Sequence, residues 1–141
     1  MADRVEFELV SPQRLLMSEP VEMVVVPGVE GDFGVLPGHS LLISAMRPGV
    51  IDIHEGGQVR DRIFVAGGFA QVSPERCTVL AEEAVMVADI DKAAAEERLA
   101  KAREALTEAQ QTAKEAGGAD TKAAEKELKT AEAMLAAASR S

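Results

Sequence analysis

One stretch of the sequence concentrates the residue types that could bind a ligand or a partner. From Pro27 to His39 the chain carries four glycines and two prolines in 13 residues. Proline removes a backbone donor and glycine favours neither helix nor strand, so the stretch predicts a tight, shaped loop. The polar side chains expected to face outward are Glu30, Asp32 and His39. The apolar side chains expected to pin the loop onto a core are Phe33, Val35 and Leu36.

Phosphate binding is the first chemistry that a glycine-rich loop suggests, and this loop does not fit it. A Walker A loop needs four residues before its Gly-Lys-Ser/Thr, whereas Gly34 and Gly38 are separated by three and His39 replaces the lysine. The nearby carboxylates of Glu30 and Asp32 would also repel an anion. Two interpretations stay open: a structural cluster of turns, or a recognition loop on a rigid scaffold.

Composition and charge limit the remaining function classes. The chain has 141 residues and a net charge of −9, which argues against nucleic acid or anionic lipid as a direct partner. The single cysteine, Cys77, excludes an internal disulfide and is expected in the core. The sequence has no apolar run of 18 residues, which a membrane-spanning helix would need, so no direct membrane insertion is expected. The start, Met-Ala-Asp-Arg, is not typical of a signal or transit peptide.

The first part of the chain reads as short strands. Val5, Phe7 and Leu9 alternate with polar residues, and similar runs recur between frequent turns as far as about residue 88. Gly56-Gly57 predicts a two-residue hairpin, and Gly67-Gly68 inside a strand pattern predicts a bulge or a close backbone approach. The pattern predicts an antiparallel β-sandwich over residues 1–88.

Residues 89–141 read as two helices. Asp89 or Asp91 can cap the first helix, Gly117-Gly118 ends it, and Asp120 or Thr121 can cap the second. Small and apolar residues recur at steps of four and three in both, which predicts an antiparallel helical hairpin and an α+β, mostly β, fold class. The expected seam residues are Ala95, Leu99, Ala102, Leu106, Ala109, Ala113, Ala116, Ala124, Leu128, Ala131, Leu135 and Ala138. Because alanine buries little surface, the hairpin is expected to be detachable rather than an ordinary helical cap, although both interpretations stay open.

No catalytic motif is apparent. His39 and His54 are the only histidines, and neither has an acidic partner at a metal-site or triad spacing. The sequence also lacks a nucleophile motif, so we expect a non-catalytic chain without a cofactor.

Three motifs resemble the epsilon subunit of the bacterial F-type ATP synthase, which is called delta in mitochondria. The first is carried by Gly28, Gly31, Gly34, Pro37, Gly38 and His39. The second is the Gly-Gly-Phe-Ala-Gln-Val stretch at 67–72, and the third is Thr-Val-Leu-Ala-Glu-Glu-Ala at 78–84. They occur in the family's order and spacing, and the resemblance covers residues 4 to 91.

The resemblance implies a non-catalytic rotor subunit of the central stalk that couples rotation of the membrane ring to ATP synthesis. Its sandwich would bind the gamma subunit and the c-subunit ring, with Glu30, Asp32 and His39 facing the ring. Its hairpin would switch between a folded and an extended state, and would inhibit ATP hydrolysis by contacting the alpha/beta catalytic subunits. The candidate contacts for those subunits are Lys122, Lys126 and Lys129. The expected location is peripheral, on the cytoplasmic face of the bacterial inner membrane.

The family's ATP-binding motif on the hairpin is incomplete in this chain. Ile90 and Asp91 match it, but Ala94 stands at the arginine position, so regulatory ATP binding is not expected and inhibition should be modest. The alternative interpretation is a stand-alone β-sandwich binding protein or small hydrolase with a helical tail. Co-purification with gamma would separate the two.

Overall fold

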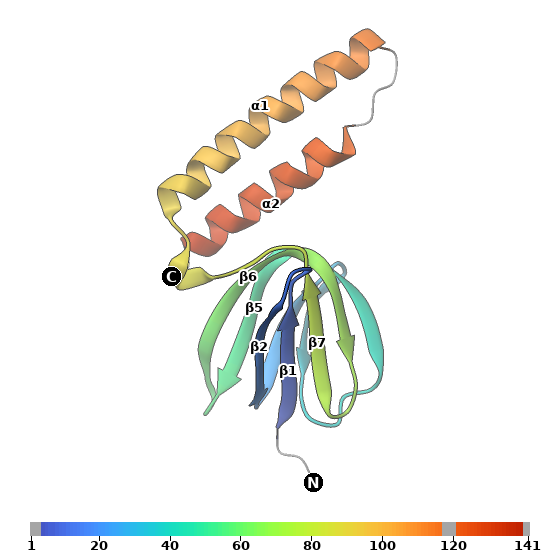
Figure 1. Cartoon of the computed structure of the whole chain (residues 1–141), viewed down its shortest axis with the longest axis vertical. Coiled ribbons are helices and arrows are strands. Elements are labelled where there is room, and N and C mark those ends of the chain that lie inside the picture. The colour runs from blue at the N-terminus through green and yellow to red at the C-terminus, as the bar shows by residue number, and fades with distance from the viewer. Residues whose placement is uncertain (1–3, 117–120, 140–141) are drawn as a thin grey trace. The chain divides into compact units, whose positions relative to one another are not determined.

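The computed structural model describes residues 4–116 and 121–139. The chain divides into two compact units, residues 1–87 and 88–141, which Figure 1 traces as strands followed by helices.

The first unit is a β-sandwich, as predicted. Its described strands form one sheet in the order β2-β1-β7-β6-β5-β3-β4, with β8 paired to β6, and the sheet folds back on itself (Figure 1). The prediction of a wholly antiparallel sheet needs one correction: β1 and β7 pair in parallel. These two strands lie far apart in the sequence, so no tight hairpin forces them to run in opposite directions. The strands are β1 (Val5–Val10), β2 (Leu15–Val21), β3 (Met23–Gly28), β4 (Gly31–Val35), β5 (Leu42–Glu55), β6 (Gln58–Val72), β7 (Arg76–Ala81) and β8 (Ala84–Met86).

The long strands β5 and β6 pair with each other along almost their whole length. Gly56 and Gly57, with φ of +60° and +76°, form the predicted two-residue turn between them. Further along, β6 pairs with β8 through residues 63–65 and with β7 through residues 68–72. Gly68 lies where β6 changes partner, with φ +120°, and a Cβ there would be 1.9 Å from the Leu80 carbonyl oxygen. The predicted close backbone approach is therefore confirmed at Gly68.

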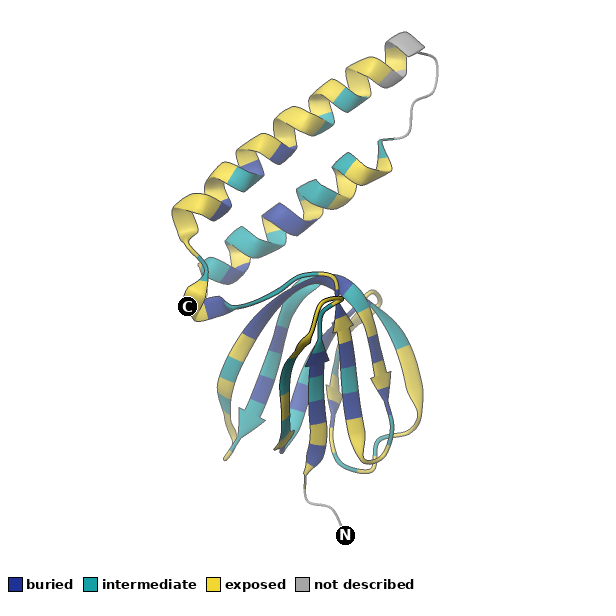
Figure 2. Cartoon of the chain, viewed as in Figure 1, coloured by how far each residue is buried: buried dark blue, intermediate teal, exposed yellow. Residues whose placement is uncertain are grey.

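The sandwich core is built from alternate residues of the strands. Val5, Phe7 and Leu9 of β1 are buried, and Cys77 and Val79 of β7 lie beside them in register (Figure 2). Burial raises the pKa of the Cys77 thiol to about 12, so this thiol stays protonated and unreactive at neutral pH.

The prediction of an irregular loop from Pro27 to His39 is wrong in its first half. The end of β3 and all of β4 form a hairpin there, with Pro27 opposite Asp32 and a two-residue turn at 29–30. The register between β3 and β5 shifts between Val25 and Gly28, so the missing N–H of Pro27 lies where the ladder is already interrupted. Within this stretch, the turn at 29–30 and residues 36–39 lie outside the strands.

The apolar side chains of this stretch are buried to different extents. Val35 is fully buried, as expected, and Phe33 is partly buried against the core. Leu36 is 54% exposed, so the expectation that it pins the segment is wrong. It follows the last residue of β4, where the chain leaves the sheet.

The second unit is the predicted helical hairpin of α1 (Lys92–Ala116) and α2 (Lys122–Ala138), preceded by a 3₁₀ turn, η1 (Val87–Asp89). The Asp91 carboxylate caps α1, because its Oδ1 accepts hydrogen bonds from the backbone N–H groups of Ala93 (3.0 Å) and Ala94 (3.4 Å). Thr121 precedes α2, but its hydroxyl donates to Glu125 Oε1 (2.9 Å), so the cap predicted for it does not form. Gly117, Gly118 and Asp120 lie outside the described residues.

The hairpin seam is formed mostly by the predicted residues. Leu99 and Ala102 of α1 are buried with Ala131 of α2, and Leu128 and Leu135 pack against them. Ala95 is buried too, whereas Leu106, Ala109, Ala124 and Ala138 are only partly so.

Candidate docking surfaces

The β3–β4 hairpin tip presents two of the three predicted outward side chains. Glu30 and Asp32 are exposed, at the turn and in the first residues of β4. Arg47 of β5 pairs with the Asp32 carboxylate and donates from Nη1 to the Gly28 carbonyl oxygen at 2.6 Å. The guanidinium therefore ties the tip to the neighbouring strand. Sequence reasoning missed Arg47, because nothing local shows that β5 passes beside this turn.

His39 lies in the segment that follows β4. It is partly exposed, and its Nδ1 is 2.7 Å from the Ser40 carbonyl oxygen. The backbone N–H of Gly38 donates to the Pro74 carbonyl at 2.7 Å, which fixes this segment to the turn between β6 and β7. His39 is thus separated from Glu30 and Asp32 by the length of β4.

The glycines and the proline of the motif have different local roles. A Cβ at Gly28 would be 2.8 Å from the Gly31 carbonyl oxygen, so only glycine allows this close cross-strand contact. Gly38 has φ +86°, which a residue with a side chain rarely adopts. At Gly34 a Cβ would meet only the Met23 sulfur at 3.6 Å, so alanine would fit. Pro37 is partly exposed between β4 and Gly38, and Gly31 adopts φ +139°.

Reversing the charge at Asp32 should be tolerated by the fold. An Asp32→Lys variant would place a cation opposite Arg47, but both side chains are solvent-exposed, so we expect a loss of about 1 kcal/mol or less. Calorimetric unfolding would show this as a small fall in Tm. A large fall would mean that the Arg47 bridge holds the sandwich together rather than the hairpin tip alone.

A row of apolar side chains crosses the outer face of the sheet. Val10 pairs with Leu80, Leu80 with Phe69 and Phe69 with Ala45, so these four residues form one rung across β1, β7, β6 and β5. Residues that pair directly in a sheet share a face. We call these four residues the apolar row.

The central side chains of the apolar row are open to solvent. Phe69 is 56% exposed and Leu80 51%, and a hollow of about 260 Å³ beside them is bounded by Pro12 and Glu82. Ile43, in the next rung, is 72% exposed. Sequence reasoning did not identify this surface. The available signal was that Phe69 and Leu80 fall in the outward phase of their alternating strands.

The hairpin carries the other predicted site residues. Ile90 is partly buried, and Ala94 is exposed in the first turn of α1. The three lysines of α2 predicted to contact the catalytic subunits are all exposed; they are Lys122, Lys126 and Lys129.

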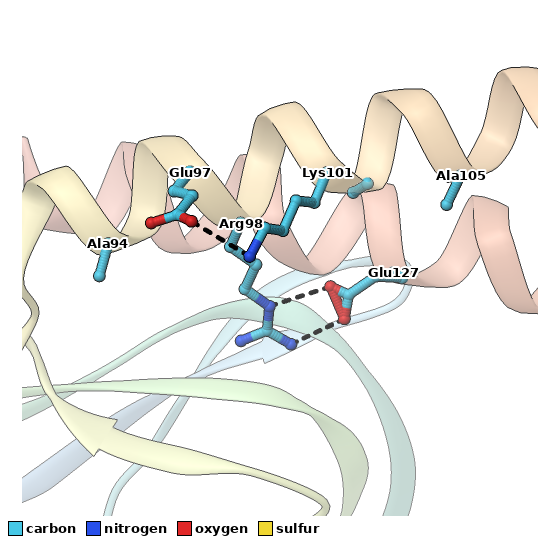
Figure 3. A pocket seen from close by; sticks show the side chains of 7 residues that line it. Ala94, Glu97, Arg98, Lys101, Ala105 and Glu127 are labelled. Atoms are coloured by element: carbon cyan, nitrogen blue, oxygen red, sulfur yellow. Dashed lines mark hydrogen bonds and ion pairs between the residues drawn. The ribbon is translucent and has the colours of Figure 1, made fainter.

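An ion pair joins the two helices and was not predicted. Arg98 Nε donates to Glu127 Oε2 at 2.9 Å, and its Nη2 donates to Oε1 at 2.8 Å (Figure 3). These hydrogen bonds lower the pKa of Glu127. The pair borders a hollow of about 520 Å³, which is also lined by Ala94, Glu97, Lys101, Ala102 and Ala105 (Figure 3).

Neither a metal-binding cluster nor a membrane-spanning helix occurs in the part of the chain that the structure describes. No group of three or more histidine, cysteine or acidic side chains is placed to hold a metal ion within residues 4–116 and 121–139. Of the helices described there, neither is both long enough and apolar enough to span a membrane.

Comparisons with known proteins agree with the three motifs. Residues 4–87 match the family described as ATP synthase, delta/epsilon chain, beta-sandwich domain. The ATP synthase epsilon chains of Rhodospirillum rubrum and Paramagnetospirillum magneticum are 62% and 59% identical over 99 and 98 residues, which cover 70% of this chain and 74% of each relative.

Solved structures give the same result for the fold. A chain of the Euglena gracilis mitochondrial ATP synthase, from a structure of OSCP, F1 and the c-ring, aligns with a TM-score of 0.77 at 27% identity, covering 97% of this chain and 82% of that one. A chain of the Tetrahymena thermophila central stalk and c-ring aligns with a TM-score of 0.51 at 13% identity over 60% of this chain and 68% of that one, which shows the fold alone. The chain therefore belongs to the family of ATP synthase delta and epsilon chains.

Proposed function

We propose that this chain is the epsilon subunit of an F-type ATP synthase: a non-catalytic subunit of the central stalk that couples ring rotation to ATP synthesis. The observation that carries the proposal is the exposed apolar row on a chain whose relatives are ATP synthase epsilon chains. As part of that complex, it would lie peripherally on the cytoplasmic face of the bacterial inner membrane.

The apolar row is proposed as the surface that binds the gamma subunit. Protein interfaces have an apolar, aromatic centre surrounded by polar groups, and Phe69 and Leu80 provide such a centre. Apart from Ile43, the next rung provides a polar margin, with Glu8 paired to Thr78 and Thr78 to Gln71. Burying Phe69 and Leu80 against a partner would remove apolar surface from water and so stabilise the complex. A stalk that transmits torque needs a surface of this kind.

The hairpin tip and the segment after β4 are proposed as the surface that meets the c-subunit ring. Glu30 and Asp32 provide exposed carboxylates, while Val29 and Leu41 provide exposed apolar side chains. The Arg47 bridge and the Gly38–Pro74 hydrogen bond hold these segments in place, which suits a contact that must transmit force.

A Leu80→Asp substitution tests the gamma-binding surface. It places a charge at the centre of the apolar row, so we expect binding to purified gamma to weaken about 100-fold or more, as for a central interface residue. The full-length variant would be titrated calorimetrically and also assayed for ATP synthesis in membranes. Its Tm should stay within a few degrees of the unchanged chain, because Leu80 is half exposed.

Gln71→Asp is the matched control. It adds the same charge to the same face, in the polar rung beside the apolar row, and should change the affinity for gamma only a few-fold. Equal weakening by both variants, or normal binding by Leu80→Asp, would contradict the proposed surface. Failure of the unchanged chain to bind gamma at all would favour the stand-alone binding protein.

The hairpin is proposed as a weak regulatory element without a nucleotide site. Its basic residues on α2 alternate with Glu125 and Glu132, and exposed ion pairs each contribute little to binding. Contact with the alpha/beta catalytic subunits through these lysines would therefore be transient.

Deleting residues 89–141 should raise ATP hydrolysis by the assembled enzyme only by a small factor, roughly two-fold, since exposed ion pairs are weak. Calorimetric titration of the full chain with ATP should give no binding heat, because Ala94 provides no guanidinium for a phosphate. Tight ATP binding, or a large rise in hydrolysis, would contradict this prediction.

A further inference from the structure

The sandwich has one side where two strand edges come close without a backbone ladder between them. Of the described strands, β2 pairs only with β1, and residues 58–62 of β6 pair only with β5. β2 also approaches β5, which continues into β6 through the Gly56-Gly57 turn. We call the boundary between residues 18–21 of β2 and residues 55–62 of the β5–β6 hairpin the open seam.

The edge strand β2 is held weakly by its own ladder. It has a strand partner on one side only, and its register with β1 shifts between Leu9 and Val10. Within β2 only Val21 is buried, so the strand contributes little to the core. A strand with one ladder and few buried side chains opens at a low free-energy cost.

Two arginines cross the open seam. Arg4, just before β1, donates from Nη1 to the Pro20 carbonyl oxygen of β2 at 3.2 Å and to Glu55 Oε1 at the end of β5 at 2.7 Å. Arg60 of β6 pairs through Nη2 with Glu19 of β2, and its Nη1 is 3.9 Å from the same Glu55 oxygen. The Glu55 carboxylate therefore lies between the two guanidinium groups, in a side chain that is only 17% exposed.

A β-bulge aims Arg60 across the open seam. Asp61 and Val59 pair with consecutive residues of β5, Ile53 and His54. Arg60 is therefore an extra residue on β6 without a partner on β5, and bulges of this kind redirect a side chain. Arg60 Nε also donates to Asp61 Oδ2 at 2.7 Å, which holds the base of the guanidinium beside its own strand.

We propose that the Arg60–Glu19 and Arg4–Glu55 pairs form a strap that closes the open seam and holds β2 in place. Exposed ion pairs add little to the stability of a whole domain, but the opening of an edge strand also costs little free energy, so a small contribution changes the open fraction measurably. Charged side chains over a strand edge also hinder its pairing with another chain. The strap concerns the sandwich alone and does not depend on its binding gamma.

Hydrogen exchange followed by mass spectrometry tests the strap in the full-length chain. An Arg60→Gln substitution removes the guanidinium and leaves a polar side chain at the bulge. We expect the amides of residues 15–21 and 55–62 to exchange about five-fold faster, a factor typical of losing an exposed ion pair. The amides of residues 76–81 in β7 should keep their rate, because β7 pairs with a strand on each side.

Arg76→Gln is the matched control. It removes the same charge from an arginine that is 3.4 Å from Glu8, but β7 and β1 are already joined by a backbone ladder. Exchange in residues 15–21 should therefore be unchanged. Glu19→Gln should accelerate exchange there as much as Arg60→Gln does, and combining the two should add little, because each breaks the same pair.

Four results would overturn the proposal. An unchanged rate in Arg60→Gln would mean that the ladder with β1 holds β2 by itself. Equal acceleration by Arg76→Gln would mean a general effect of net charge. Acceleration of residues 76–81 together with 15–21 would mean that the pair stabilises the whole sandwich rather than its edge. Additive effects of Arg60→Gln and Glu19→Gln would mean that the two side chains act separately.

Discussion

A Gly68→Ala substitution should lower the free energy of unfolding of the sandwich by about 4 kcal/mol, the sum of backbone strain and a steric clash. The added Cβ would lie 1.9 Å from the Leu80 carbonyl oxygen, and the residue would have to keep φ +120°. Neither can relax easily, since Gly68 pairs with Ala81 at the point where β6 passes from β8 to β7. The chain has no Trp or Tyr, so scanning calorimetry is a better measurement than fluorescence.

Two glycine controls separate the two causes. At Gly57, with φ +76° and open space around it, alanine adds only the backbone strain, about 1 kcal/mol. At Gly34 alanine adds neither backbone strain nor a steric clash, so the free energy of unfolding should change by no more than about 0.5 kcal/mol. If Gly68→Ala were no worse than Gly57→Ala, β6 and β7 would have room to separate, and the close approach would not be a constraint on the fold.

The features that could be predicted from sequence are those with local physical causes. The turn at Gly56-Gly57 follows from backbone conformations that only glycine adopts readily. The cap at Asp91 follows because its carboxylate can reach the free backbone N–H groups at the start of α1. The alternation in β1 follows from burial on one face of a strand. Each cause acts within a few residues, so it is visible in a short window of sequence.

The features that could not be predicted depend on which distant residues become neighbours. Pro27 fits in a strand only because the ladder to β5 is interrupted beside it. The apolar row needs three separate strand registers, one of them parallel, before its four members align. The apolar seam of the hairpin predicts that α1 and α2 pair, but it does not say which polar side chains meet beside it, so the contact of Arg98 with Glu127 could not be predicted.

Phe7→Ala should cost about 3–5 kcal/mol of unfolding free energy, whereas Phe69→Ala should cost less than about 0.5 kcal/mol. Phe7 is fully buried in the sandwich core, so its removal leaves a cavity, while Phe69 is 56% exposed on the outer face. Phe33 is partly exposed and packs over Gly28, so its removal should cost about 1–2 kcal/mol.

Measuring both the affinity for gamma and the Tm of these variants distinguishes a residue that stabilises the fold from one that binds a partner. Phe69→Ala should weaken binding about ten-fold or more at nearly unchanged Tm, as expected for an aromatic residue near the centre of an interface. Phe33→Ala should lower Tm without weakening gamma binding, because Phe33 lies in β4 and outside the apolar row. If Phe69→Ala destabilised the chain as much as Phe7→Ala, the outer face would belong to the core, and the apolar row could not be the surface that binds gamma.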